Sequence, residues 1–124
     1  MKIKTIDFWN NLEKDEATDI KAIEGDTVVL INGIVFLIQR KNDWNNIACW
    51  RIYKSKINIV QTFEQFRAFC QTQEINYIRV EGIGKHQYKI LNLVLRHAPE
   101  TTRIVYAKDE SEEYNRHIWY VKVY

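Results

Sequence analysis

Residues 79–85, Arg-Val-Glu-Gly-Ile-Gly-Lys, combine the residue types with which proteins hold phosphate groups. Gly82 and Gly84 have no side chain, so the backbone N–H groups of a turn there can approach an anion closely. Arg79 and Lys85 add positive charge, and the helix expected to begin at Lys85 adds the positive end of its dipole. The pattern predicts a phosphate-binding turn between a strand and a helix, formed by Arg79, Gly82, Gly84 and Lys85.

Two further segments alternate basic and aromatic side chains. They comprise Arg51, Tyr53, Lys54 and Lys56 in the first segment, and Lys85, His86, Tyr88 and Lys89 in the second. Lysines that hold the backbone, with aromatic rings that stack on bases, are typical of proteins that bind single-stranded nucleic acid. Under this alternative, Lys54, Lys56, Lys85 and Lys89 would carry the binding. The formal net charge of +2 is too small to indicate such a partner by itself.

Metal binding and thiol chemistry are not indicated by the sequence. His86, His97 and His117 are isolated from one another and from cysteines or paired carboxylates, so we expect no metal site. Cys49 and Cys70 lie in apolar surroundings, where a thiol is neither exposed nor activated by a positive partner. We expect both cysteines to be reduced core residues.

The segment from Asp109 to Glu113 is strongly acidic, with Glu110 and Glu112 between those two residues. Such a cluster can bind a cation or a basic partner. It can also keep the tip of a hairpin solvated and the edge of a sheet soluble. The second interpretation is the simpler one.

The strongest structural signal is the pair of apolar runs in residues 27–38, which Asn32-Gly33 separates. Asn-Gly readily supplies the two positive φ angles of a type I′ turn, so this segment is predicted to be a β-hairpin over residues 27–40. Because the strands are apolar on both faces, each face of the sheet must be covered. The helices predicted further along the chain are the candidates.

The rest of the chain is predicted to supply the other strands and helices of one α+β domain spanning residues 1–124. They are a short helix capped by Thr5, a strand at 20–23 with a turn at 24–26, a loop at 41–46, a strand at 47–53, a helix from Thr62 to 74 with a Thr62–Gln65 capping box and a stripe of Phe63, Phe66, Phe69 and Cys70, a strand at 75–80, a helix at 85–98, and strands at about 102–108 and 117–124. This order predicts a mostly antiparallel, mixed sheet flanked by helices.

Two features of the chain resemble the GNAT-type acyltransferase superfamily. The segment Arg79-x-x-Gly82-x-Gly84 resembles the Arg/Gln-x-x-Gly-x-Gly/Ala loop with which that family binds the pyrophosphate of acetyl-CoA. The predicted order of a meander, a helix, a strand, a helix and two closing strands is also similar to the family's fold. The resemblance implies an acyltransferase or acyl-CoA binder.

The two features place the cofactor loop differently. In the family, the pyrophosphate loop comes just before the first helix that follows the meander. The corresponding segment here is residues 51–62, and it contains no glycine. The family's usual general acid, a tyrosine soon after the last helix, has its nearest counterpart in Tyr106. Its usual base, a Glu on a central strand, has no assigned counterpart, so no catalytic residue is carried over from the resemblance.

Four tryptophans, Trp9, Trp44, Trp50 and Trp119, are a high aromatic content for a core of this size. Trp is favoured at protein interfaces, so we do not expect all four to lie inside, although a flat α/β core can also take them up. We therefore expect a non-enzymatic interaction or assembly protein without a cofactor, with a degenerate GNAT-like fold. The abundance of Ile, Lys, Asn and Tyr fits an accessory or virion-associated protein encoded by a bacteriophage.

The expected location is the cytoplasm, or a virion if the chain is encoded by a phage. No apolar run has the length of a membrane span, because the longest is interrupted at Asn32-Gly33. Residues 1–9 contain no apolar stretch of signal-peptide length, so we expect no secretion by that route and no membrane partner.

Overall fold

A computed structural model describes residues 1–12, 20–42, 45–54, 56–83, 85–97, 104–108 and 116–122. The elements in chain order are β1 (Lys2–Lys4), α1 (Ile6–Asn10), β2 (Thr27–Ile31), β3 (Ile34–Asn42), β4 (Asn45–Ile52), α2 (Ile59–Thr72), β5 (Tyr77–Ile83), α3 (Lys85–Arg96), β6 (Ile104–Lys108) and β7 (Arg116–Lys122). The predicted α+β class, with its mostly antiparallel mixed sheet, is confirmed.

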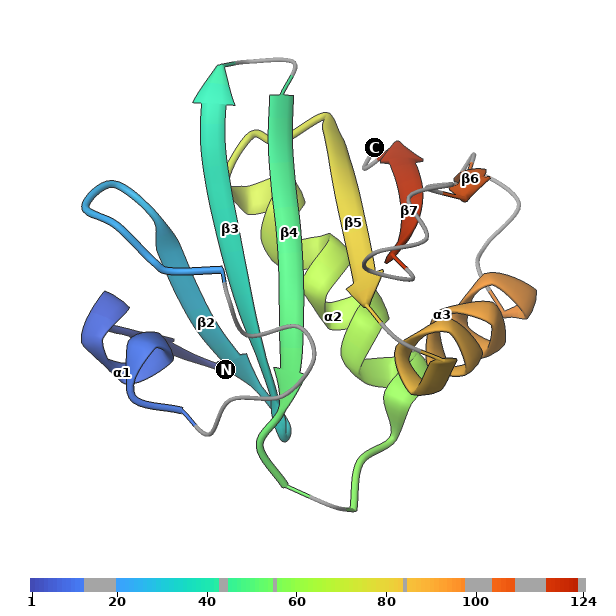
Figure 1. The fold of residues 1–124 in the computed structure, drawn as a ribbon, viewed down its shortest axis with the longest axis horizontal. Helices are drawn as coiled ribbons and strands as arrows, with labels where there is room; N and C mark the ends of the chain where they lie inside the picture. The colour runs from blue at the N-terminus through green and yellow to red at the C-terminus, as the bar shows by residue number, and fades with distance from the viewer. Residues whose placement is uncertain are drawn as a thin grey trace.

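The described strands form one sheet in the order β1-β2-β3-β4-β5-β7-β6 (Figure 1). Neighbouring strands are antiparallel except for β4 and β5, which are parallel and joined through α2. A parallel pair requires such a crossover, because the chain must return to the same end of the sheet. The carboxyl ends of β4 and β5 therefore lie at the same end of the molecule.

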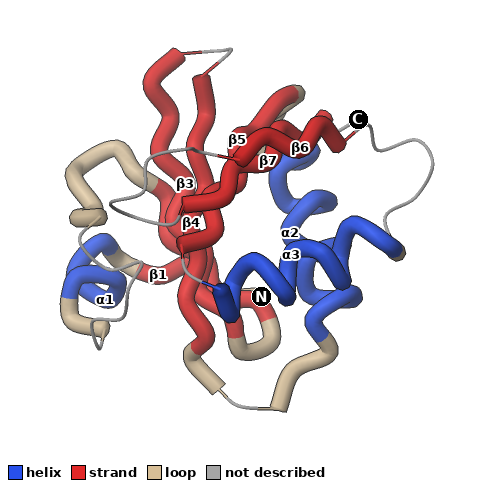
Figure 2. Tube along the Cα trace, turned by 45° about the vertical axis from the view of Figure 1, so that its right-hand side comes forward, coloured by secondary structure: helices blue, strands red, loops and turns tan. Residues whose placement is uncertain are grey.

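Helices cover the two faces of the sheet, as the apolar hairpin strands require (Figure 2). On one face, which we call the α2/α3 face, alternate residues of β2 to β5 form a core with the apolar stripe of α2 and with Ile90 and Leu91 of α3. On the opposite α1 face, Val28, Val35, Leu37 and Cys49 form a smaller core with Trp9 and Ala22. The predicted stripe of Phe63, Phe66, Phe69 and Cys70 is buried.

The predicted hairpin is present, with Ile31 opposite Ile34, but its turn is not of type I′. Only Asn32 has a positive φ, of 56°, and the Gly33 N–H donates to the Ile31 carbonyl at 2.8 Å, as in a γ-turn. Gly33 is required for space instead, since a Cβ added there would lie 2.9 Å from Cγ1 of Ile57. The prediction missed this contact because Ile57 is distant in the sequence.

The helix starts agree with the sequence in one case and differ in the other. Thr5 caps α1, accepting a hydrogen bond from the Phe8 N–H at 3.1 Å, as predicted. Helix α2 begins before Thr62, and its N-cap is Asn58, whose side chain accepts from Gln61 N–H at 3.1 Å. The capping-box prediction is therefore wrong: Asn58 is a stronger N-cap residue and lies one turn earlier. The Thr62 hydroxyl donates back to the Asn58 carbonyl at 2.7 Å.

Residues 20–23 do not form the predicted strand. The Asn10 side chain takes the place of a neighbouring strand, because its amide donates to the Ala22 carbonyl at 3.0 Å and its oxygen accepts from the Ala22 N–H at 2.9 Å. The Trp9 indole donates to the Ile20 carbonyl at 2.9 Å. Side chains of α1 therefore satisfy the backbone of this segment, and the predicted turn at 24–26 follows, with Gly25 at a φ of 95°.

Strands β3 and β4 extend into the segment predicted to be a loop at 41–46. Asn42 pairs with Asn45 after a register shift between Arg40 and Asn42. Asn46 of this segment is buried, and its side-chain amide donates to the Tyr77 carbonyl at 3.1 Å, so a distant partner accommodates a residue that locally suggests a loop. None of the described helices has the length and apolar character needed to cross a membrane.

Candidate functional site

Strand β5 continues through the first part of the glycine-rich segment. Gly82 is opposite His117 of β7, and Ile83 is opposite Arg116. Gly82 is therefore a strand residue and not the turn residue that was predicted, because pairing with β7 draws the chain into the sheet; its role in phosphate binding stays a prediction. Gly84 lies outside the described residues, and Lys85 is the first residue of α3.

Arg79 is directed to a carboxylate of its own strand. Its Nη2 lies 2.8 Å from Oε1 of Glu81, whose side chain is 4% exposed. These two residues share a face of β5, since side chains two apart in a strand point the same way. Ile78 and Val80 belong to the core on the α2/α3 face, so Arg79 and Glu81 face the other side, away from α3. The structure does not combine Arg79 with the start of α3 into one anion site.

The parallel strands β4 and β5 pair over a short length and then separate. Their described register pairs are Ile47 with Arg79 and Ala48 with Val80, although β4 continues to Ile52. Beyond these pairs, the side-chain amide of Gln87 in α3 donates to the Trp50 carbonyl at 3.1 Å. Gln87 is 7% exposed. We call this region the β4–β5 gap, and within it the Gln87 side chain satisfies the Trp50 carbonyl.

The connection from β4 to α2, residues 53–58, is the place where the resemblance puts the cofactor loop. The N–H groups of Tyr53 and Lys54 donate to the Gly33 carbonyl at 2.6 and 3.1 Å. The Asn58 side chain accepts a hydrogen bond from the Gln61 N–H at the start of α2. A phosphate bound here would have to compete with each of these bonds, because a donor N–H that is already paired offers an anion little.

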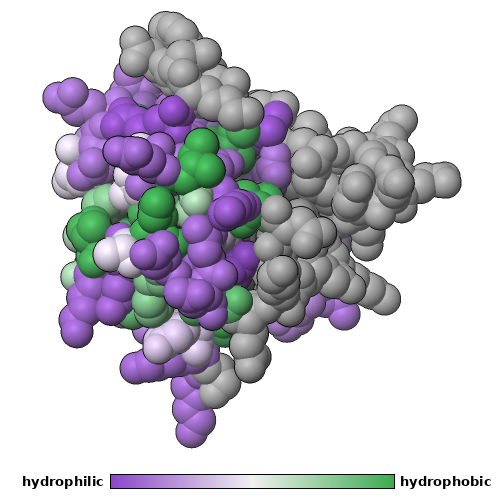
Figure 3. All heavy atoms as spheres, turned by 60° about the vertical axis from the view of Figure 1, so that its left-hand side comes forward, coloured by the Kyte–Doolittle hydropathy of each residue, from purple (hydrophilic) through white to green (hydrophobic). Residues whose placement is uncertain are grey.

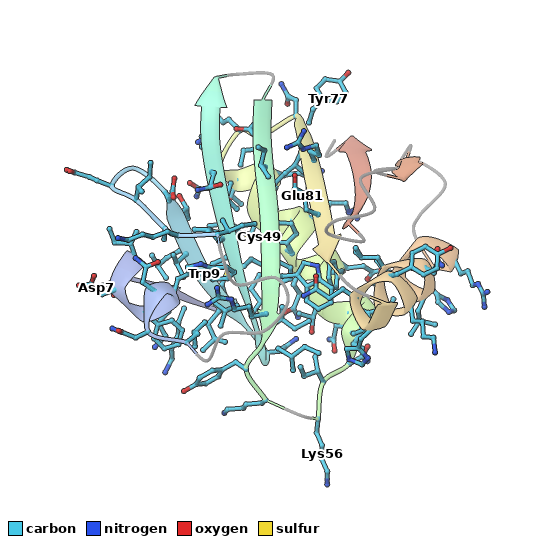
Figure 4. The ribbon with its side chains drawn as sticks, viewed as in Figure 1. Asp7, Trp9, Cys49, Lys56, Tyr77 and Glu81 are labelled. Atoms are coloured by element: carbon cyan, nitrogen blue, oxygen red, sulfur yellow. The ribbon has the colours of Figure 1, made fainter. Side chains whose placement is uncertain are left out.

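Arg51 is not available to a ligand in the way that the basic–aromatic pattern suggests. It is 5% exposed, its Nη1 donates to the Trp9 carbonyl at 2.9 Å, and its Cζ lies 4.1 Å from the centre of the Trp9 ring. The expectation that Arg51 joins a binding patch is wrong, because strand alternation turns it inward onto α1. Cys49 and Trp9 lie on the same side of the sheet (Figure 4).

The exposed residues after Arg51 join two residues that the sequence pattern did not single out. The Tyr53 ring, in a residue that is 48% exposed, lies 5.6 Å from the ring of Phe8, and Lys4 Nζ lies 4.9 Å from the centre of that Phe8 ring. We call Lys4, Phe8, Tyr53 and Lys54 the Tyr53 surface. The contact between α1 and the end of β4 creates it, and no local spacing in the sequence could have revealed it.

The other predicted basic residues lie on separate elements. Lys56 is exposed and points away from the sheet at the end of the molecule (Figure 4). His86 and Lys89 are exposed on α3, whereas Tyr88 packs against the core of the α2/α3 face. In the second basic–aromatic segment, His86 and Lys89 are therefore exposed to solvent, while the Tyr88 ring contributes to packing.

The two cysteines are buried thiols, as predicted, and lie on opposite faces of the sheet. Burial raises the pKa of Cys70 to about 12, although the positive charge of Arg40 opposes the rise. Such a thiol is not a nucleophile at neutral pH.

Within the described ranges, no three His, Cys, Asp or Glu side chains come together as a metal site would require. The acidic segment 109–113 lies outside the described residues. So do the side chains of Tyr106 and His117.

Trp9 and Trp50 are fully buried. Trp44 and the side chain of Trp119 lie outside the described residues. The described tryptophans therefore belong to the core, one on each face of the sheet, rather than to a surface.

No protein-family model, curated protein or solved structure matches this chain. The resemblance to GNAT-type acyltransferases stays a prediction, and function has to be argued from the geometry of the chain itself.

Proposed function

We propose that this protein is a non-enzymatic interaction or assembly protein that contacts another protein through the Tyr53 surface. The observation that carries the proposal is that N–H groups in and next to the β4–α2 connection are already hydrogen-bonded within the protein. The Tyr53 and Lys54 N–H groups donate hydrogen bonds to the Gly33 carbonyl, and the Asn58 side chain accepts one from the Gln61 N–H at the start of α2. This segment is built to hold the hairpin against α2, so it supports a structural rather than a phosphate-binding role for the place where a cofactor loop is expected.

Exposed apolar side chains next to this connection support a contact with another protein. Ile52 is 41% exposed and Tyr53 is 48% exposed. Tyrosine combines a large apolar ring with a hydroxyl group, which suits it to interfaces that form and separate. Figure 3 shows hydrophobic residues in small groups among hydrophilic ones on the face turned forward from the left-hand side of Figure 1.

Site-specific photo-crosslinking tests the proposal. A photoreactive phenylalanine analogue at position 53 should yield a discrete protein adduct in cells that produce the chain. Tyr77 is the matched control, because it is also an exposed tyrosine, 39% accessible, and lies at the opposite end of the molecule (Figure 4). Equal crosslinking at both positions, or none at position 53, contradicts the proposal.

An acyl-CoA binder is the second candidate, and the β4–β5 gap favours it. Ligands of parallel strands commonly bind beyond their carboxyl ends, and here the Trp50 carbonyl is held by a side chain that a ligand amide can displace. Under this candidate, acetyl-CoA binds the unmodified protein in calorimetry, and Gly84→Val abolishes that binding while the fold survives. A flat titration with the unmodified protein ends this candidate.

A further inference from the structure

We infer that the Tyr53 surface takes an acidic, extended protein segment that carries an apolar anchor side chain. This inference rests on the proposed function and names the chemistry of the partner. Its elements are the aromatic pair of Phe8 and Tyr53 and the lysines near that pair.

The contacts make the surface continuous across three elements. Lys4 of β1 lies over the Phe8 ring of α1 at 4.9 Å, and Phe8 contacts Tyr53, just after β4, with ring centres 5.6 Å apart. Phe8 is half-buried, so its position is set by the core of the α1 face, against which it packs. Tyr53 extends from this fixed base and remains 48% exposed. The result is an apolar ridge that is held in place before any partner arrives.

The charges around this ridge are positive. Lys2 and Lys4 lie opposite Leu30 and Val28, residues that pack on the α1 face, so both lysines project on the same side as Phe8. Lys54 follows Tyr53 directly and is exposed. An acidic segment on this surface would meet the Lys4 ammonium at the Phe8 ring and the exposed Lys54 next to Tyr53 in the chain, and such charge complementarity speeds association and suppresses wrong partners.

Three acidic residues of the described chain are directed elsewhere or are already paired. Asp7 points outward from the far side of α1 (Figure 4). Asp26 accepts hydrogen bonds from the Ile23 N–H and from Gln39, close to the turn at the other end of the hairpin. Glu81 is bound to Arg79. None of these three carboxylates is directed to a lysine of the Tyr53 surface.

The ring geometry favours a protein segment over single-stranded nucleic acid. Base stacking needs an open, flat ring face. The Tyr53 ring instead leans on Phe8 at an interplanar angle of 57°, and Lys4 lies over the Phe8 ring. Arg51, which would add a cation beside Tyr53, is turned inward onto Trp9. An aliphatic or aromatic anchor that contacts a tilted ring edge fits this arrangement better than a stacked base.

Fluorescence anisotropy with defined probes tests the inference. The probe is a labelled peptide of twelve residues alternating Glu and Leu, and its controls are the same peptide with Gln for Glu and a twelve-nucleotide oligothymidylate. We expect the acidic peptide to bind, and Lys54→Glu to weaken it about tenfold, because a like charge then faces the ligand. Lys89→Glu, an equivalent reversal on α3, should change the affinity less than about twofold.

Lys4→Glu should weaken binding of the acidic peptide to a similar extent as Lys54→Glu. Because Lys4 also contacts Phe8, the Lys54 variant carries the conclusion if the Lys4 variant fails to fold by circular dichroism. Binding of the oligothymidylate in preference to the peptide overturns the inference. So does equal binding of the Glu and Gln peptides, or equal losses for Lys54→Glu and Lys89→Glu.

The crosslinking experiment separates this inference from the proposed function. If the acidic peptide does not bind but position 53 still crosslinks to a protein, the partner chemistry is wrong and the interaction role stands. If position 53 does not crosslink, the proposed function itself fails.

Discussion

The two faces of the sheet are covered in different ways. On the α2/α3 face, aromatic side chains fill the space: Phe36 stacks on Phe66 with ring centres 4.1 Å apart, and Phe63 meets both Phe36 and Trp50 edge-on at 5.3 and 5.4 Å. On the α1 face, Trp9 and Asn10 hold a segment that has no regular structure, and Arg51 donates to the Trp9 carbonyl of α1.

The difference follows from what each face must accommodate. A long helix such as α2 satisfies most of its own backbone, so it needs only apolar side chains to attach to the sheet. Residues 20–23 form neither helix nor strand, so their backbone N–H and carbonyl groups need other partners. On the α1 face, a few specific hydrogen bonds therefore add to a small apolar core, whereas a larger aromatic core dominates the α2/α3 face.

The largest effect is expected from breaking the aromatic cluster with Phe36→Ala. Phe36 is fully buried between Phe63 and Phe66, so its removal leaves a cavity and should lower the free energy of unfolding by about 3–5 kcal/mol. Urea denaturation followed by fluorescence measures this. Ile23→Ala, at a residue that is 60% exposed, is the control and should stay within about 0.5 kcal/mol of the unmodified protein.

Arg51→Ala should have the largest effect of a polar change on the α1 face. The substitution leaves the Trp9 carbonyl without its buried donor and should cost about 2–3 kcal/mol. Arg51→Lys keeps the charge but loses the planar group over the Trp9 ring. The stability of this variant should therefore fall between those of the unmodified protein and Arg51→Ala. If Arg51→Ala lowered the free energy of unfolding as much as Phe36→Ala does, the expected difference between the two faces would be contradicted.

Asn10→Ala should release residues 20–23 with a smaller loss of global stability. Both hydrogen bonds to Ala22 disappear, which should cost about 1–2 kcal/mol. Hydrogen exchange at the Ala22 amide should accelerate while exchange in β3 changes little. Asn10→Asp retains the acceptor for the Ala22 N–H but not the donor to its carbonyl, so it should protect that amide better than Asn10→Ala does.

The smallest effect concerns the thiol buried on the α2/α3 face. Burial raises the pKa of Cys70 from 9.0 to about 12, so the unfolded chain ionises first as the pH rises. The neutral, buried thiol of Cys70 therefore contributes fully to the stability below pH 9, and this contribution is lost progressively toward pH 12. At pH 9.5 the loss should be about 0.8 kcal/mol.

Denaturation at pH 8 and at pH 9.5 measures this effect against Cys70→Ala, which lacks the ionisable group. The difference between the two proteins cancels the titration of other residues. An identical pH dependence in both would contradict the raised pKa.

Local signals in the sequence predicted the parts of the fold that local interactions determine. Thr5 caps α1, the apolar runs on either side of Asn32-Gly33 pair with each other, and the stripe of α2 lies on its buried face. Each signal spans fewer than about a dozen residues, the range over which periodicity and capping act.

The capping-box prediction failed locally, at Asn58, but several other failed predictions concern residues whose partners are distant in the sequence. Gly82 is drawn into the sheet by His117, and Arg51 is turned inward to Trp9. The candidate binding surface depends on the contact of Phe8 with Tyr53. Such pairs cannot be read from spacing, because they depend on which strands and helices become neighbours.

The Asn32-Gly33 turn has a practical consequence for anyone who wishes to label or rearrange this chain. Hairpin tips are ordinarily preferred sites for inserted tags and for circular permutation. Here, Asn32 donates to Thr62 and the Gly33 carbonyl accepts from Tyr53 and Lys54, so an insertion would separate the hairpin from α2. The turn at Gly25, where an added Cβ would meet nothing within 4 Å, is the better place to open the chain.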